Sequence, residues 1–239
     1  SRLLGIDMLL ERLPRQLSQG QRQRVSLGRA LVRNPKLYLL DEPISHLDAK
    51  LRNAIRRELK LMRARVAQTT VYVTHDYLEA LSLADRVVVL FEGQVLQFDQ
   101  TKAVYNRPAA VEVGQLFGDP PMMFFDGKIN AARQFLSEDG SFNLETQGSI
   151  SELEAEQEVI LGIRPTDVLL APPEAGQIAG DVYSVQNQFD RQLVTVQANG
   201  HLIDIIASGK VSISEGDKAG VKIIPQICYY FDKKTHAAL

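Results

Sequence analysis

Apolar residues recur every three or four positions in several stretches of the first half of the chain. This spacing predicts a helix over residues 3–13 and a second over Gln21–Val32, for which Ser18 is a suitable N-cap. A third amphipathic helix is expected from Leu51 to Val66, with a basic opposite face, and residues 77–84 are also typical of a helix.

Short, continuous apolar runs alternate with these helices. Leu37–Leu40 and Thr70–Val73 are typical of strands buried on both faces, as in a parallel sheet. A third strand is expected over Arg86–Phe91, and Glu92-Gly93 predicts a turn into Gln94–Phe98. The order of strands and helices predicts an α/β fold with at least part of a parallel sheet.

The pattern changes near Gly118-Asp119-Pro120-Pro121. Beyond it the expected strands are short and separated by turns, which predicts a small, OB-like β-barrel. These strands are 160–164, 180–185, 192–196, 202–206 and 221–224. We therefore expect one domain over residues 1–118 and a second over 119–239.

Composition narrows the functional classes. The 239 residues are 45% hydrophobic and 23% charged, with a net charge of −2, so no global field favours nucleic acid or anionic lipid. The single cysteine, Cys228, cannot form an internal disulfide, which fits a reducing compartment. No apolar run approaches the roughly 20 residues that span a bilayer, so membrane contact is expected only through partners.

Two acids follow the first predicted strand. Asp41 and Glu42 stand where α/β sheets bind ligands, so Asp41 is placed to support Mg²⁺ and Glu42 to polarise an attacking water. An ordinary acidic turn after a strand explains the pair equally well.

Two other polar segments have a functional and a simpler interpretation. Ser18-Gln19-Gly20-Gln21 opens a helix whose N-terminus would attract a phosphate, although an ordinary capped helix has the same sequence. His75 follows the second strand and could contact a transferring phosphoryl group, although a lone histidine is more often a core or surface residue.

The order of four segments favours the functional interpretation of these residues over the simpler structural one. Residues 17–25 (LSQGQRQRV), 39–43 (LLDEP), 45–48 (SHLD) and 74–76 (THD) resemble, in order and spacing, the signature, Walker B, D-loop and H-loop of ATP-binding cassette (ABC) ATPases, the motor subunits of membrane transporters. The resemblance covers residues 1 to 118. It implies a partial P-loop NTPase core followed by the OB-like barrel.

The resemblance also implies roles for single residues. Asp41 would support Mg²⁺, Glu42 would be the catalytic base and His75 the switch histidine. The signature residues Ser18, Gln19, Gly20 and Gln21 would bind ATP held by the opposite subunit, and Asp48 would couple the two sites across the dimer. Gln19 departs from the family, which usually has Gly there.

The second half carries a further resemblance. Residues 161–165 (LGIRP) with Asp167-Val168, and residues 118–123 (GDPPMM), are similar to the regulatory barrel of bacterial sugar-importer ATPases of the maltose type. Related barrels occur in polyamine and metal-ion importers. The expected partners are a second ABC ATPase subunit, transmembrane permease subunits and, indirectly, a solute-binding protein, at the cytoplasmic face of the bacterial inner membrane.

One element of the family is missing from the sequence. A P-loop needs Gly-x-x-x-x-Gly-Lys-Ser/Thr, and the Gly-Lys pairs at 127–128 and 209–210 are followed by Ile129 and Val211. We therefore expect a fragment that neither binds ATP tightly nor hydrolyses it alone, and whose first 118 residues leave an exposed sheet edge.

Three alternatives remain open. The chain could act as a non-catalytic dimerisation or regulatory module, or belong to a soluble ABC ATPase of DNA repair or translation, which the maltose-type barrel argues against. Nine arginines between residues 22 and 65 permit nucleic-acid binding, but no aromatic stacking pattern accompanies them, so no nucleic-acid partner is expected.

Overall fold

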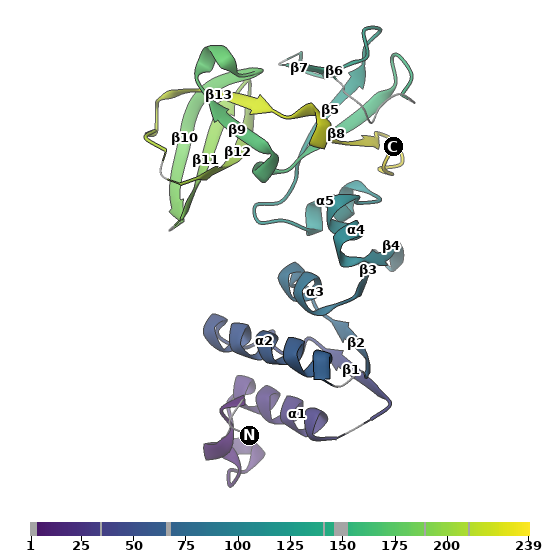
Figure 1. The fold of residues 1–239 in the computed structure, drawn as a ribbon, viewed down its shortest axis with the longest axis vertical. Coiled ribbons are helices and arrows are strands. Elements are labelled where there is room, and N and C mark those ends of the chain that lie inside the picture. Colours follow the sequence, from purple (N-terminus) through teal and green to yellow (C-terminus); the bar gives the residue numbers. More distant parts are fainter. Residues whose placement is uncertain are drawn as a thin grey trace. The chain divides into compact units, whose positions relative to one another are not determined.

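The computed structural model describes residues 4–33, 35–65, 68–140, 142–145, 153–188, 190–209 and 211–239 (Figure 1). The chain divides into two compact units. The first comprises Ser1–Val87 and Asp99–Lys102, and the second Val88–Phe98 and Ala103–Leu239. The domain boundary expected near residue 118 stays a prediction.

The N-terminal segment does not form the helix expected over residues 3–13. Residue 3 lies outside the described residues, and the segment that follows forms short 3-10 turns, such as Asp7–Leu9, with another at Pro14–Gln16 just beyond it. Gly5 has a φ of +59°, which breaks a helix, and the buried Leu4 and Ile6 pack beside Gly28 of the next helix. Tertiary packing therefore overrides the local helical spacing.

Helices and strands alternate through the first unit as expected. Their bounds are α1 Gln19–Val32, β1 Leu37–Asp41, α2 Ala49–Arg65, β2 Thr69–Val73 and α3 Tyr77–Leu83. Val66, the expected end of the third helix, lies outside the described residues. A small core of buried residues, including Leu27, Ile44 and Ile55, holds these elements together.

Strands β1 and β2 pair in parallel, from Leu37 opposite Thr69 to Asp41 opposite Val73, which confirms that part of the prediction. They form a two-stranded sheet, so each strand leaves an edge unpaired among the described residues. The expectation of burial on both faces is wrong for this chain, because Leu39 is 72% exposed and Val71 50%. Within the described residues, no second layer covers that face.

A β-hairpin and two short helices follow. The hairpin joins β3 (Arg86–Phe91) to β4 (Gln94–Gln100), and both turn residues have positive φ, 47° at Glu92 and 76° at Gly93, as a type I′ turn requires. The helices are α4 (Thr101–Asn106) and α5 (Val111–Leu116).

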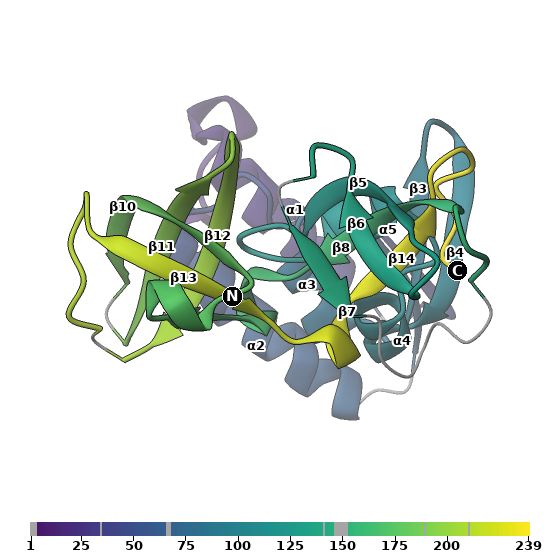
Figure 2. The same ribbon diagram turned by 90° about the horizontal axis from the view of Figure 1, so that it is seen from above.

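The remaining strands form two five-stranded sheets, which lie next to each other in Figures 1 and 2. One has the order β14-β8-β5-β6-β7 and the other β12-β11-β10-β13-β9. The bounds are β5 Met123–Ile129, β6 Gln134–Ser137, β7 Asn143–Glu145, β8 Glu158–Ile163, β9 Val168–Ala171, β10 Ile178–Gln188, β11 Arg191–Ala198, β12 His201–Ser208, β13 Lys218–Ile223 and β14 Tyr229–Asp232.

All five strands expected beyond residue 118 are present in β8, β10, β11, β12 and β13, although the expected ends at residues 164 and 224 each lie one residue past the observed strand. The other five are short or contain polar residues and glycine, which weakens their signal in the sequence. Three 3-10 turns that begin with proline connect the strands, at Pro165–Asp167, Pro173–Ala175 and Pro225–Ile227. One continuous core, which includes Phe135, Leu161 and Ile205, joins the two sheets.

Candidate functional site

The turn after β1 holds Glu42 in an uncommon conformation. Glu42 has a φ of +41°, in the left-handed region that a non-glycine residue rarely adopts. Its amide donates to the carbonyl oxygen of Val73 at 2.9 Å. Its own carbonyl oxygen accepts hydrogen bonds from Gln23 Nε2 at 2.7 Å and Ser45 Oγ at 3.1 Å. Surrounding contacts therefore fix the backbone of the expected catalytic base.

The parallel register brings the two predicted catalytic residues together. His75 follows β2 as Glu42 follows β1, and His75 Nδ1 lies 3.3 Å from Glu42 Oε1. The side chains are 71% and 45% exposed, so both remain accessible to a ligand. The pair can hold a proton between an imidazole and a carboxylate at an open sheet edge.

Asp41 ends β1 at the same edge, and it is exposed. Within the described part of the chain, no group of three or more histidine, cysteine, aspartate or glutamate side chains could hold a metal ion. A single exposed carboxylate nevertheless fits Mg²⁺, because proteins often bind Mg²⁺ through one or two carboxylates together with the phosphates of a substrate.

The predicted phosphate-binding segment opens α1 as a capping box. Ser18 Oγ accepts from the Gln21 amide at 3.3 Å, and the Ser18 amide donates to Gln21 Oε1 at 2.9 Å. Ser18 and Gln19 are exposed. A Cβ atom on Gly20 would lie 3.1 Å from the carbonyl oxygen of His46, so glycine permits the close approach of the loop after β1.

Asp48 is placed differently from the other predicted site residues. Its Oδ1 accepts from the Leu51 amide at 2.9 Å, which caps the N-terminus of α2. Four residues later, the Arg52 guanidinium donates to the carbonyl oxygens of Ser45 and Leu47, both at 3.0 Å, and lies 3.9 Å from Asp76. The loop before α2 is therefore held by that helix.

A buried carboxylate supports the segment that carries His75. Glu79 is 2% exposed and accepts from Tyr72 Oη and Thr74 Oγ1, each at 2.9 Å. Burial, and then the charge of Glu79, raises the pKa of Tyr72 far above its ordinary value, so the phenol stays a donor. Asp76 caps α3 through the Leu78 and Glu79 amides.

Sequence reasoning missed the supporting residues Gln23, Arg52, Tyr72 and Glu79. Glu79 lies three residues after Asp76, so the sequence marks it as an acid in the first turn of a helix. No local pattern, however, shows that its side chain is buried. The partners of Gln23 and Arg52 lie in other elements, so a single-sequence pattern contains no signal for them.

Several arginines of the basic stretch are used within the fold. Arg24 donates to the carbonyl oxygens of Leu4 and Gly5 at 3.0 and 3.2 Å, and Arg63 donates to that of Leu83 at 2.8 Å and pairs with Asp85. These guanidinium groups stabilise loops of the first unit, which gives them a structural explanation that needs no nucleic acid.

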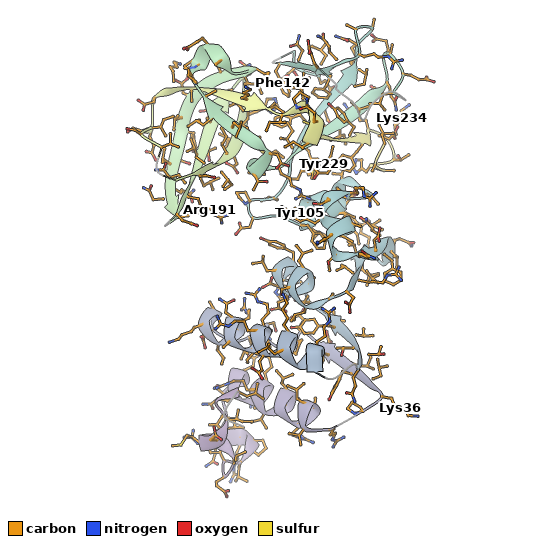
Figure 3. The ribbon with its side chains drawn as sticks, viewed as in Figure 1. Lys36, Tyr105, Phe142, Arg191, Tyr229 and Lys234 are labelled. Carbon is orange, nitrogen blue, oxygen red and sulfur yellow. The ribbon has the colours of Figure 1, made fainter. Side chains whose placement is uncertain are left out.

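In the second unit, the arginine of the LGIRP segment joins helices to strands. Arg164 is 3% exposed and donates to the carbonyl oxygens of Tyr105 and Phe117. Its guanidinium carbon lies 4.0 Å from the ring centroid of Tyr105 and 5.5 Å from that of Tyr229; both rings are labelled in Figure 3. The contact fastens α4 and the end of α5 to the β14-β8 edge.

A hollow of about 310 Å³ lies where the two sheets meet, lined by Phe125, Asp126, Ser137, Glu138, Asp139 and His201. His201 Nε2 is 2.7 Å from Asp139 Oδ2, and its ring meets Phe125 edge-on. The bond ties the turn after β6 to the start of β12, so it links the two sheets at this hollow.

Two family models match the chain. The ABC transporter model matches residues 2–45, and the MalK OB fold domain model matches residues 118–168. In the described residues, no helix has both the length and the apolar character required to cross a bilayer.

Curated relatives match nearly the whole chain. It is 36% identical to the sulfoquinovosyl glycerol transport ATP-binding protein SmoE of Agrobacterium fabrum, with 100% of this chain and 67% of the relative covered. It is 37% identical to the xylose/arabinose import protein XacK of Haloferax volcanii (99% and 63% covered) and to the trehalose/maltose import protein MalK of Thermococcus litoralis (99% and 66%).

The chain thus spans about two thirds of the length of these relatives. The expected fold class, a partial ABC ATPase region followed by an OB-fold domain, is confirmed. The chain belongs to the MalK-like family of ABC transporter ATP-binding proteins.

Proposed function

We propose that this chain forms the part of an ATPase subunit that carries the catalytic residues, and that this subunit drives solute import. The observation that carries the proposal is the 3.3 Å contact between Glu42 and His75 at the shared end of β1 and β2. A carboxylate held against an imidazole can orient a water for attack and stabilise the proton that the water releases. The exposed Ser18 and Gln19 would contact the ATP that is held by a partner subunit.

The cofactors of this activity are ATP and Mg²⁺. Asp41 would hold Mg²⁺, which neutralises charge on the phosphates when it is bound. Ser18, Gln19, Gly20 and Gln21 would meet the phosphates of ATP at the start of α1, where backbone amides favour anions. Asp48 already caps α2, so its coupling role across a dimer would act through the position of that helix.

The names of the relatives support a class of solute. Their names specify transport of sulfoquinovosyl glycerol, import of xylose or arabinose, trehalose or maltose, and sn-glycerol-3-phosphate. We propose a sugar or a related small solute as the cargo, with a second ATPase subunit and transmembrane permease subunits as partners at the cytoplasmic face of the membrane. A polyamine or a metal ion is the alternative cargo.

The test compares this chain with a full-length protein that also carries a P-loop. The full-length wild type should hydrolyse ATP. Glu42→Gln should lower kcat by about 10² or more, because the amide that replaces the carboxylate cannot accept a proton. Glu11→Gln, an exposed acid of the same unit, is the matched control and should retain full activity. This chain alone should show no turnover.

The second candidate is a non-catalytic dimerisation or regulatory module. The second unit has its own extensive core of buried residues, which supports this candidate. Turnover by the pure chain that disappears in Glu42→Gln would contradict this candidate. An inactive full-length protein would contradict the proposed ATPase.

A further inference from the structure

The Gln23 side chain links α1 to the loop that follows β1. Its Nε2 donates to the carbonyl oxygen of Glu42 at 2.7 Å and reaches Ser45 Oγ at 3.4 Å. Its Oε1 accepts from the His46 amide at 3.3 Å. One amide group therefore bonds both the residue proposed as catalytic base and the loop three and four residues beyond it.

The carbonyl oxygen of Glu42 is where these contacts converge. It accepts from Gln23 Nε2, from Ser45 Oγ at 3.1 Å and from the Ser45 amide at 3.4 Å. A residue with φ near +41° persists only when its surroundings fix it. Of these donors, only Gln23 lies outside the loop itself, so it sets the position of the loop relative to α1.

We propose that Gln23 is a positioning residue that couples the start of α1 to the orientation of Glu42. This inference rests on the proposed function. Ser18 and Gly20 open the helix that carries Gln23, and Gly20 itself lies against the His46 carbonyl. When a nucleotide at that helix start shifts or steadies α1, Gln23 transmits the change to the Glu42 backbone and hence to the 3.3 Å contact with His75.

Two substitutions distinguish the role of the Nε2 donor of Gln23 from that of its Oε1 acceptor. Gln23→Glu keeps an acceptor for the His46 amide and nearly the same shape, but replaces the donor to Glu42 by a carboxylate oxygen that repels the carbonyl. Gln23→Ala removes both. Arg29→Ala is the control, because Arg29 is exposed on the same helix and lies outside the signature segment.

The first readout is steady-state ATP hydrolysis by the full-length protein. We expect kcat to fall about tenfold or more in both Gln23 variants while KM for ATP changes little, since a misplaced base affects the reaction step more than ground-state binding. Gln23→Asn, whose shorter side chain cannot span the same distance, should not restore kcat. Arg29→Ala should match the wild type in both constants.

The second readout is amide hydrogen exchange at His46 in this chain. Exchange should accelerate in Gln23→Ala and stay slow in Gln23→Glu, which a general loss of structure would not produce. Wild-type kcat in Gln23→Glu, or a fall in kcat matched by Arg29→Ala, would overturn the coupling role and leave the proposed ATPase intact. An inactive full-length wild type would overturn the proposed function and this inference together.

Discussion

Arg52 shows how one side chain can stabilise a functional loop without touching a ligand. Its guanidinium satisfies the carbonyl oxygens of Ser45 and Leu47, which lie in the segment before α2. Loss of these bonds leaves two carbonyl oxygens without their charged donor. We expect Arg52→Ala to lower the free energy of unfolding by about 1–3 kcal/mol.

The measurement for Arg52 is urea denaturation followed by circular dichroism. Arg57→Ala is the control, because Arg57 is exposed on the same helix and should change stability by less than about 0.5 kcal/mol. Equal denaturation midpoints for the two variants would show that the loop is held without Arg52.

Cys228 gives the second unit a pH-dependent stability at the alkaline end. Burial, and then the charge of Asp167, raises the pKa of this thiol from 9.0 to about 12. The folded state therefore keeps a proton that the unfolded state loses. The stabilisation is fully present below about pH 9 and is lost as the pH rises toward 12.

The prediction for Cys228 compares how the free energy of unfolding depends on pH in the wild type and in Cys228→Ala. Between pH 8 and about pH 11, the wild type should lose stability more steeply than Cys228→Ala, which has no thiol to ionise. Guanidinium denaturation at each pH measures both slopes, and ionising groups remote from Cys228 cancel in the comparison. Parallel curves would mean that the thiol is accessible and titrates normally in the folded state.

At the scale of elements, sequence patterns predicted the features that depend on nearby residues or on regular strand pairing. Ser18 was expected to cap α1 and does so, because a cap depends on residues three positions apart. Glu42 and His75 were expected at one sheet edge and meet there, because parallel strands end together. The helix over residues 3–13 was wrong, since packing of Leu4 and Ile6 on α1 decides that segment.

The unpredicted features share a long-range cause. Gln23 and Arg164 find their partners 19 to 59 residues away, and Arg52 also reaches Asp76 beyond β2, so their own neighbours in the sequence give no signal for these contacts. The strands β5, β6, β7, β9 and β14 owe their existence to pairing within the two large sheets. Their register depends on tertiary contacts rather than on propensity.

The exposed face of the β1-β2 sheet predicts self-association. Leu39 and Val71 are opposite each other and both exposed, and neither strand has a second neighbour among the described residues. Such an apolar face can associate with another copy, because contact removes apolar surface from water. We expect Leu39→Lys to reduce the concentration-dependent increase in sedimentation coefficient while leaving the circular dichroism spectrum unchanged.

A control for Leu39 lies beside it on the same strand. Leu40 points to the other face and packs against the core of the first unit. Leu40→Lys should therefore destabilise that unit, and should increase rather than reduce association. If Leu39→Lys associates like the wild type, the exposed face is not the contact surface.

At the scale of the whole molecule, the two units have unequal cores. Among the described residues, the main cluster of the second unit contains 22 buried side chains, whereas that of the first contains 8. Because stability grows with the apolar surface removed from water, the first unit should unfold at lower urea concentration than the second. Hydrogen exchange measured by mass spectrometry along a urea series should resolve two steps.

Core truncations assign each step to its unit. Leu27→Ala, in the smaller core, should shift only the first step, and Ile205→Ala, in the larger core, only the second. Each should cost about 2–5 kcal/mol, the range for deleting a buried aliphatic side chain. If either variant shifts both steps equally, the units unfold as one. The proposed regulatory barrel would then not fold independently of the segment that carries Glu42 and His75, and a change in one would necessarily alter the stability of the other.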